Sequence, residues 1–255
     1  MVPCYNEGIR LDEDAFLSLA CDDVRLLFVD DGSHDNTRER LSCLAARDPQ
    51  RITILTLRRN RGKGEAVRAG LRQALAEGAS VVGYVDADLS TPIPEIRRLL
   101  RVLLGGNQSV LLGSRVALLG RNVTRRASRH YIGRVLASAA SLVLQIPVYD
   151  TQCGAKLFRA SAALESALAE PFLSRWVFDV ELLGRMLIGT PQTPGLPVSR
   201  FAEEPLHVWH GIAGSKVRPW DITFAAADLA RIAVDMAVRR HRVRRKDTIR
   251  GESRS

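Results

Sequence analysis

The sequence predicts an α/β fold in which a mainly parallel central sheet is flanked by helices. Short apolar runs alternate with stretches of helical period along the chain, as expected when strands and helices alternate. Three of the apolar runs end in clusters of polar residues, and such sheets bind ligands beyond the carboxyl ends of their strands. With 255 residues and 46% hydrophobic content, the chain can bury a substantial core.

The expected elements follow one another in that order. The first strand is reduced to Met1 and Val2, so we expect either that the start is truncated or that the first strand is built otherwise. Asp35 or Asn36 can cap a helix that ends near Arg47, because short polar side chains accept hydrogen bonds from the first helical turn. The other elements expected before residue 114 are strands at 24–30, 52–57, 81–85 and 109–113, and helices at 13–20, 66–75 and 94–104.

Two later helices differ in their polar faces. In the helix expected at 134–145, polar residues form one narrow stripe, so most of its surface must be buried in protein or lipid. In the helix expected at 221–238, Asp228, Arg231 and Asp235 share one face, which favours packing on the protein over insertion into lipid. We therefore expect one domain over residues 1–220, followed by an amphipathic helix and a basic tail over 221–255.

The net charge of +9 is concentrated near the C-terminus, where eight Lys or Arg residues at 239–254 accompany only Asp247 and Glu252. Such a segment can bind anionic lipid head groups, bind nucleic acid without sequence preference, or remain a solvated end. The longest uncharged stretch, 135–149, is shorter than the roughly 20 apolar residues of a membrane span. Four cysteines without CxxC spacing, and no secretory signal at the start, predict a reduced cytoplasmic protein.

Asp86-Ala87-Asp88 is the most informative motif, because it ends the apolar run at 81–85 with two carboxylates. Hard oxygen ligands suit Mg²⁺ or Mn²⁺, which can also bind the phosphates of a diphosphate. A solvated turn after a strand is the alternative. Asp30-Asp31-Gly32-Ser33 and Asn60-Arg61-Gly62-Lys63-Gly64 follow two other apolar runs, so three polar loops are expected to converge at one edge of the sheet.

These loops belong to a longer series of motifs, through which the chain resembles the family 2 glycosyltransferases of GT-A fold. Later motifs are similar to the lipid-phosphate branch of that family, the dolichyl-phosphate glucosyltransferases and bacterial polyprenyl-phosphate relatives. Besides the three loops, the resemblance depends on Pro3-Cys4-Tyr5-Asn6-Glu7, Gly113-Ser114-Arg115, Asp150-Thr151-Gln152-Cys153-Gly154, Arg175-Trp176-Val177-Phe178-Asp179-Val180-Glu181 and Gly214-Ser215-Lys216.

The resemblance implies a nucleotide pocket at the acidic edge of the sheet. Pro3, Tyr5 and Glu7 would line this pocket, and Asp31 would accept a hydrogen bond from the base. The alternative for Asp31 is a purely structural role, since Asp-Gly-Ser is also favourable turn chemistry.

The resemblance also implies how the donor diphosphate would be held. Asp86 would approach the ribose and Asp88 the metal, so this pair is the candidate site for Mg²⁺ or Mn²⁺. Lys63 would add positive charge near the donor phosphates. The alternative for Lys63 is a glycine turn whose following helix offers its amide groups to the phosphates instead.

The acceptor side follows from charge. A lipid monophosphate is already ionised at neutral pH, so the site needs cations more than a strong base. Guanidinium groups bind phosphate oxygens through paired hydrogen bonds, although ordinary helix-surface charge is the alternative for each arginine. The resemblance implies these candidates for the acceptor phosphate: Arg115, Arg126 or its neighbour Arg125, Arg129 and Lys216.

The candidate catalytic residues are Asp88, Arg115, Asp150 and Asp179. Asp150 or Asp179 could act as a base toward a hydroxyl acceptor, or could orient the sugar or an arginine. Trp176 could stack on a sugar or fill the core. Packing or surface roles are expected for residues without metal-ligand spacing, namely Cys153, His130, His207 and His210.

The implied reaction is a metal-dependent, inverting transfer of a hexose, glucose from UDP-glucose, to dolichyl or undecaprenyl phosphate at the cytoplasmic membrane face. The partners would be a nucleotide-sugar donor, a polyprenyl-phosphate acceptor and the membrane surface, to which the protein would bind peripherally. GDP-mannose as donor and a soluble hydroxyl acceptor are open alternatives. A nucleic-acid-binding protein would explain the basic tail but not the acidic edge, and a non-catalytic nucleotide-sugar binder is a further alternative.

Overall fold

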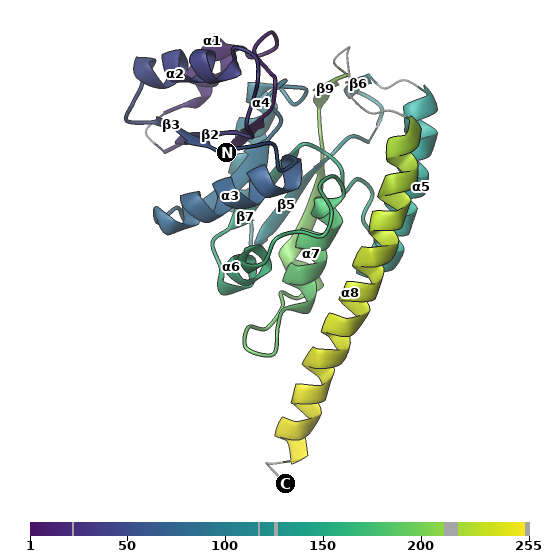
Figure 1. Cartoon of the computed structure of the whole chain (residues 1–255). Helices are drawn as coiled ribbons and strands as arrows, with labels where there is room; N and C mark the ends of the chain where they lie inside the picture. Colours follow the sequence, from purple (N-terminus) through teal and green to yellow (C-terminus); the bar gives the residue numbers. More distant parts are fainter. Residues whose placement is uncertain (22, 117, 125–126, 212–218, 253–255) are drawn as a thin grey trace.

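The computed structural model describes the chain except residues 22, 117, 125–126, 212–218 and 253–255, and of residues 124, 127–135, 219–223 and 247–252 it describes only the backbone. Two groups of strands lie side by side at the centre, with helices packed around them (Figure 1). A long helix at the C-terminus runs along one flank of the molecule (Figure 1). The expected α/β architecture is therefore confirmed.

The first sheet is parallel throughout and has the order β1-β2-β3, from β1 (Val2–Cys4), β2 (Leu26–Asp30) and β3 (Ile52–Thr56). The second has the order β4-β7-β5-β8, from β4 (Val81–Val85), β7 (Ala155–Arg159), β5 (Val110–Ser114) and β8 (Phe201–Pro205). The amide of Val85 donates to the carbonyl of Met1 at 3.2 Å, which places β1 next to β4. A small parallel pair, β6 (Asn122–Thr124) and β9 (Val208–His210), completes the strands.

The helices that the sequence predicts in the first half of the chain are present within a few residues: α1 (Glu13–Leu19), α2 (Thr37–Arg47), α3 (Lys63–Ala76) and α4 (Ile93–Gly105). At the start of α2, Asp35 rather than Asn36 accepts the hydrogen bond from the Thr37 amide, at 3.0 Å. The second half contains α5 (Ala127–Leu144), α6 (Ala162–Ala169), α7 (Phe178–Ile188), a 3-10 turn (Val198–Arg200) and α8 (Pro219–Glu252).

Strand β7 is antiparallel to both of its neighbours, β4 and β5, whereas β5 and β8 are parallel. This reversal matters for the site. The carboxyl ends of β4 and β5 and the segment that leads into β7 all lie at the same edge of the sheet. Residues 150–154 therefore lie opposite the Asp86-Ala87-Asp88 loop, although they precede their strand rather than follow it.

The two faces of the second sheet bury different cores, because side chains alternate along each strand. Val82 and Tyr84 of β4 join a core shared with α3, α5, α6, α7 and α8, whereas Val85 joins a core shared with α1, α2 and α4. Helices thus cover both faces, as the sequence predicts.

Two helices are longer than expected. Helix α5 begins at Ala127, and α8 continues through the basic segment to Glu252 instead of ending near residue 238. Helix α8 packs on the domain through Ala225, Leu229, Ile232 and Met236, which are all buried. The acidic residues of its predicted stripe also bind protein groups: Asp228 accepts a hydrogen bond from the Ser174 hydroxyl at 2.6 Å, and Asp235 pairs with Arg239 at 2.7 Å.

Candidate functional site

The predicted convergence of polar loops is confirmed at the edge where β2, β3 and β4 end. The two carboxylate oxygens of Asp31 accept hydrogen bonds from the backbone amides of Arg61 and Gly62, at 2.7 and 2.8 Å. Burial raises the pKa of Asp31, and the two amides act in the opposite direction. Gly32 has a φ of +67°, and a Cβ there would lie 2.7 Å from the backbone of Arg59, so this turn needs glycine. Asp31 therefore fixes the loop before α3.

Lys63, the first residue of α3, extends from this loop to the Asp86-Ala87-Asp88 motif. Its Nζ lies 2.6 Å from Oδ1 of Asp86, and each side chain is about one third exposed. Burial alone would lower the pKa of Lys63, but Asp86 and Asp179 outweigh burial and raise it, so Lys63 is a cation at neutral pH. Asp86 in turn lies against Gly154, where a Cβ would come within 1.9 Å of Oδ2.

Asp88 is held by the turn that follows β4. Its Oδ1 accepts a hydrogen bond from the Ser90 amide at 3.0 Å, and Leu89 between them has a φ of +50°. A left-handed backbone at a leucine is strained, and such strain is concentrated at functional sites. The turn keeps the Asp88 carboxylate at the edge of the sheet, partly exposed.

The aspartate pair fits a cation that is shared with a substrate. Among the residues that the structure describes, no three His, Cys, Asp or Glu side chains form a group that could hold a metal. Mg²⁺, however, commonly takes only one or two carboxylates from a protein and completes its coordination with water and phosphate oxygens. Asp86 and Asp88 supply hard oxygen ligands of that kind.

The residues predicted to line the nucleotide pocket follow β1. Pro3 lies in β1 opposite Val29, and the ring of Tyr5 meets His34 edge-on at 6.5 Å. The Glu7 amide donates to the Thr37 hydroxyl at 2.8 Å, and its carboxylate pairs with Arg10 at 2.6 Å. These contacts tie the segment after β1 to the start of α2.

Arg115 and Asp150 form a bidentate ion pair where β5 ends. Nε of Arg115 lies 2.7 Å from Oδ2 of Asp150, and its second guanidinium nitrogen lies 2.7 Å from Oδ1. The guanidinium also stands 5.5 Å from the ring centroid of Trp209. Glu203 supports the loop by accepting hydrogen bonds from the amides of Tyr149 and Asp150, at 2.7 and 2.6 Å. Of the two roles predicted for Asp150, this geometry matches the orientation of an arginine.

Asp179 lies in a buried cluster with Tyr84 and Lys156. Its Oδ1 accepts a hydrogen bond from the Tyr84 hydroxyl and lies 2.9 Å from Nζ of Lys156. Its Oδ2 lies 3.5 Å from Nε2 of Gln152. Burial raises the pKa of Tyr84 well above its usual value, and Asp179 raises it further, so the phenol stays protonated and donates to the carboxylate.

Of the remaining predicted residues, the structure describes the side chains of some and not of others. Trp176 is 45% exposed, so it does not fill the core. Cys153 is fully buried, and burial raises its pKa to about 11, as suits a packing role. His207 is partly exposed beside Glu95. Arg125, Arg126 and Lys216 lie outside the described residues, and for Arg129 and His130 the structure describes only the backbone of α5.

Sequence reasoning missed Lys156, Trp209 and Glu203. A lysine between the apolar residues of β7 is the only local signal for the first, because a strand buried on both faces rarely carries a charge without a partner. Trp209 and Glu203 are distant in sequence from Arg115 and Asp150, so no spacing rule connects them.

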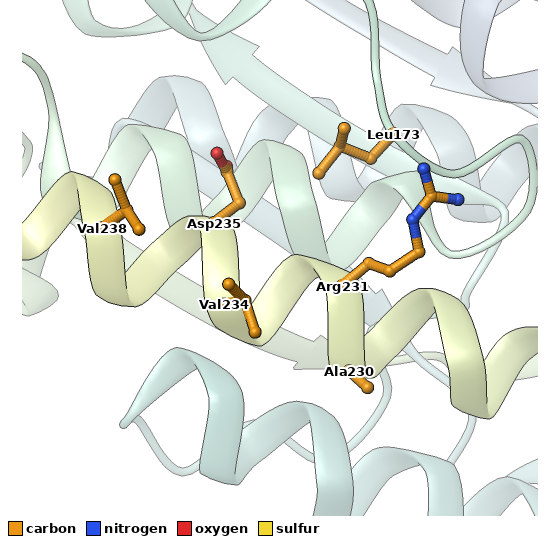
Figure 2. A pocket seen from close by; sticks show the side chains of 6 residues that line it. All are labelled: Leu173, Ala230, Arg231, Val234, Asp235 and Val238. Atoms are coloured by element: carbon orange, nitrogen blue, oxygen red, sulfur yellow. The ribbon is translucent and has the colours of Figure 1, made fainter.

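Two grooves lie outside this group of charges. One, of about 550 Å³, is on the flank of α8, where Leu173 and the α8 residues Ala230, Arg231, Val234, Asp235 and Val238 line it (Figure 2). It contains none of the predicted site residues. The other, of about 710 Å³, lies between α5 and β8, with Leu142, Ile146 and Pro147 on its walls and Tyr149 and Glu203 where it approaches Asp150.

Comparisons with known proteins agree with this geometry. The family described as Glycosyl transferase family 2 matches residues 1–165. The chain is 32% identical over 249 residues to the dolichyl-phosphate β-glucosyltransferase ALG5C of Trichomonas vaginalis, covering 92% of this chain and 70% of the relative. It is 27% identical over 219 residues to the polyprenol monophosphomannose synthase of Mycolicibacterium smegmatis, covering 86% and 82%.

A solved structure supports the fold at lower sequence similarity. Glucosyl-3-phosphoglycerate synthase from Mycobacterium tuberculosis, crystallised with Mn²⁺, UDP and glucosyl-3-phosphoglycerate, superposes with a TM-score of 0.57 and 20% identity. The match covers 94% of this chain and 77% of the other, and it identifies the fold as GT-A. With a family match over more than half of its length and a curated relative above 30% identity, the chain belongs to glycosyl transferase family 2.

Proposed function

We propose that the protein transfers a hexose from a nucleotide diphosphate to a polyprenyl phosphate with inversion at the anomeric carbon, and that the donor is UDP-glucose. The main support is a pair of cations at one edge of the sheet. Lys63 contacts the Asp86 carboxylate directly, and Arg115 is held by Asp150, whose loop reaches Asp86 where the Asp86 amide donates to the Gly154 carbonyl at 3.0 Å. Two fixed cations at one edge of the sheet suit a reaction that brings two phosphate groups together.

The donor would lie over the aspartate edge. Tyr5 and Asp31 would contact the base, and Asp86, Asp88 and Lys63 would face the ribose and the diphosphate. Asp86 and Asp88 would hold Mg²⁺ or Mn²⁺, which would neutralise charge on the departing nucleotide diphosphate. Lys63 supports the same end electrostatically, because it is already held as a cation beside Asp86.

The acceptor phosphate would bind Arg115. Asp150 fixes the guanidinium in one orientation through two hydrogen bonds, and a pre-oriented guanidinium binds phosphate oxygens with a smaller loss of side-chain entropy. Since the lipid phosphate is ionised at neutral pH, attack on the anomeric carbon requires no strong base. The groove that approaches Asp150 between α5 and β8 has apolar walls at Leu142, Ile146 and Pro147, and this part of it suits the first isoprene units of the lipid.

The membrane would be contacted through α8. No helix in the described part of the chain combines the length and apolar character needed to cross a bilayer. Helix α8 instead exposes Phe224, Val234 and Val238, followed by the exposed arginines Arg242 and Arg245. Exposed apolar side chains and a basic segment are the two signals that together give stable peripheral attachment.

A donor screen tests the proposal. The full chain is mixed with vesicles that contain undecaprenyl phosphate, either radiolabelled UDP-glucose or GDP-mannose, and Mg²⁺ or Mn²⁺. We expect label from UDP-glucose in the chloroform-soluble product, and loss of that label in EDTA. Asp88→Asn should lower turnover by about 100-fold, as for the loss of one electrostatic contact to the leaving group. Asp48→Asn, at the end of α2, is the control and should leave turnover unchanged.

Two outcomes would overturn parts of the proposal. GDP-mannose is the second donor candidate, because a polyprenol monophosphomannose synthase is among the relatives. If label enters the lipid from GDP-mannose and not from UDP-glucose, the donor is GDP-mannose and the proposed donor is wrong. If label is found only in a water-soluble glycoside, the acceptor is a soluble compound and the proposed lipid acceptor is wrong.

A further inference from the structure

Lys156 is a buried lysine to which the proposed reaction gives no task. Its side chain is fully buried in β7. Nζ lies 2.9 Å from Oδ1 of Asp179, donates to the Cys153 carbonyl at 2.5 Å, and stands 5.2 Å from the centroid of the Tyr84 ring. An ammonium group out of water is tolerated only when it is paired and hydrogen-bonded, and Asp179 and the Cys153 carbonyl supply these partners to Lys156.

Asp179 is equally constrained. Its side chain is 6% exposed, and donors surround the carboxylate: the Tyr84 hydroxyl and Lys156 at Oδ1, and the Gln152 amide near Oδ2. It also lies in the first turn of α7, where the helix dipole favours negative charge. A general base needs an accessible lone pair and a path for the substrate proton, and the burial of this carboxylate among donors disfavours that role.

The cluster connects directly to the donor side of the site. The N-terminal ends of α3 and α7 touch, since a Cβ on Gly64 would lie 2.9 Å from Cβ of Phe178, and the Gly64 amide donates to the Arg175 carbonyl at 3.2 Å. Lys63 precedes Gly64, and Asp179 follows Phe178. In agreement with this proximity, the negative charge of Asp179 contributes to the raised pKa of Lys63, against the lowering by burial.

We propose that Lys156 is a positioning residue for the transfer reaction: together with Tyr84 it fixes Asp179 as a buried anion, and this anion keeps Lys63 against Asp86. Charges then alternate from the core to the surface, in the order Lys156, Asp179, Lys63 and Asp86. The inference rests on the proposed function only for the identity of the transferred sugar and the acceptor. It assigns Asp179 to positioning instead of proton transfer.

Lys156→Met tests the inference, because methionine has a similar length and no charge. Without its cation, Asp179 loses its fixed place, and Lys63 loses the second carboxylate that holds its ammonium group beside Asp86. We expect kcat to fall by about 100-fold, as for a misplaced charge at a reacting centre, while KM for the lipid acceptor changes less than about twofold. Affinity for UDP with Mn²⁺, measured by calorimetry, should fall by about tenfold.

Two further variants separate positioning from folding. In Lys156→Met/Asp179→Asn the buried charges are removed together, so the melting temperature should recover, but kcat and UDP affinity should stay low. Arg159→Met is the matched control, because Arg159 is a cation of the same strand whose partners among the described residues are backbone carbonyls, those of Leu103, Leu104, Gly106 and Gln108. It should lower the melting temperature and leave UDP affinity unchanged.

The outcomes are distinct from those of the donor screen. The inference is overturned when Lys156→Met retains full UDP affinity, or when the double variant regains wild-type kcat together with its stability. A wild-type protein that binds UDP but labels no lipid would overturn the proposed function alone, because the UDP affinities of the variants still report where Lys63 lies.

Discussion

At Gly154 the backbone passes so close to Asp86 that a side chain would displace the carboxylate. The Cβ of an alanine would lie 1.9 Å from Oδ2, which is an impossible contact. Gly154→Ala should therefore move Asp86 away from Lys63 and lower kcat/KM by about 100-fold, as for a misplaced group near the reacting atoms. Steady-state kinetics with the preferred donor checks this.

The control for this change is Gly105→Ala at the end of α4, where a Cβ meets nothing within 4 Å. This variant should keep full activity. Equal losses in the two variants would show that the close approach to Asp86 is unimportant for turnover.

Glu65, in the first turn of α3, gives a prediction about pH. Its two hydrogen bonds from Arg68, both 2.8 Å, lower the pKa of the carboxyl below the usual value of 4.5. A carboxyl group whose pKa is lowered by folding stabilises the protein at pH values above its pKa in the unfolded chain. This stabilisation is lost as the pH falls through its pKa in the folded protein. Glu65→Gln should therefore lower the free energy of unfolding by about 1 kcal/mol at pH 7, and by much less near pH 3.

Urea unfolding at both pH values measures this difference. Glu165→Gln is the control, because Glu165 is an exposed residue in the first turn of α6 and therefore senses a similar helix dipole. If Glu65→Gln lowers the free energy of unfolding by the same amount at pH 3 and pH 7, the stabilisation does not come from the charge of Glu65.

For single residues, the sequence predicts which side chains belong to the candidate site better than it predicts which groups they contact. The paired carboxylates and Lys63 could be placed at one edge because strand ends converge. The contact of Lys156 with Asp179 could not be predicted, because the two residues lie on different elements and their pairing follows from burial. The bidentate contact of Arg115 with Asp150 likewise joins the end of β5 to a loop 35 residues later.

Helix α8 is the element whose docking is most directly testable. Ile232 is fully buried against the core, whereas Val234, two residues later, is 66% exposed. Ile232→Ala should lower the free energy of unfolding by about 2–5 kcal/mol, because it leaves a cavity under the helix. Val234→Ala should change it by less than about 0.5 kcal/mol.

Urea unfolding of the two variants provides the comparison. If both variants lower the free energy of unfolding by a similar small amount, α8 is not docked on α5 and α7 in solution. A larger loss for Ile232→Ala alone supports α8 as part of the folded domain.

The elements differ in how far they can be predicted. The helices and strands of the first half follow from apolar period and turn residues. The full length of α8 was not predicted, although the segment after residue 238 is rich in arginine, a good helix former, and contains no proline before residue 255. The antiparallel direction of β7 depends on which strands become its neighbours, and a local pattern carries no such information.

For the whole molecule, the prediction concerns the distribution of charge. The exposed arginines Arg242 and Arg245 should strengthen binding to vesicles with anionic lipid, by about 1 kcal/mol each near the surface. Replacing both by alanine should lower the vesicle-bound fraction in co-sedimentation, and salt near 0.5 M should have the same effect on the wild type, because salt screens surface charge.

The control is the double variant Arg72→Ala/Arg101→Ala, whose residues are exposed on α3 and α4. It removes the same charge from other parts of the surface. If it reduces vesicle binding equally, the net charge of the protein and not α8 drives the association.

The reversed direction of strand β7 also has a consequence for co-translational folding. Strands β1, β2 and β3 can pair as soon as residue 56 has left the exit tunnel, but β4 and β5 obtain their shared partner only after Arg159 has emerged. Until then, the nascent chain carries two hydrophobic strands with open hydrogen-bonding edges, the kind of intermediate that chaperones shield. The arrangement that brings the reactive groups together thus also delays completion of the sheet until more than half of the chain has been translated.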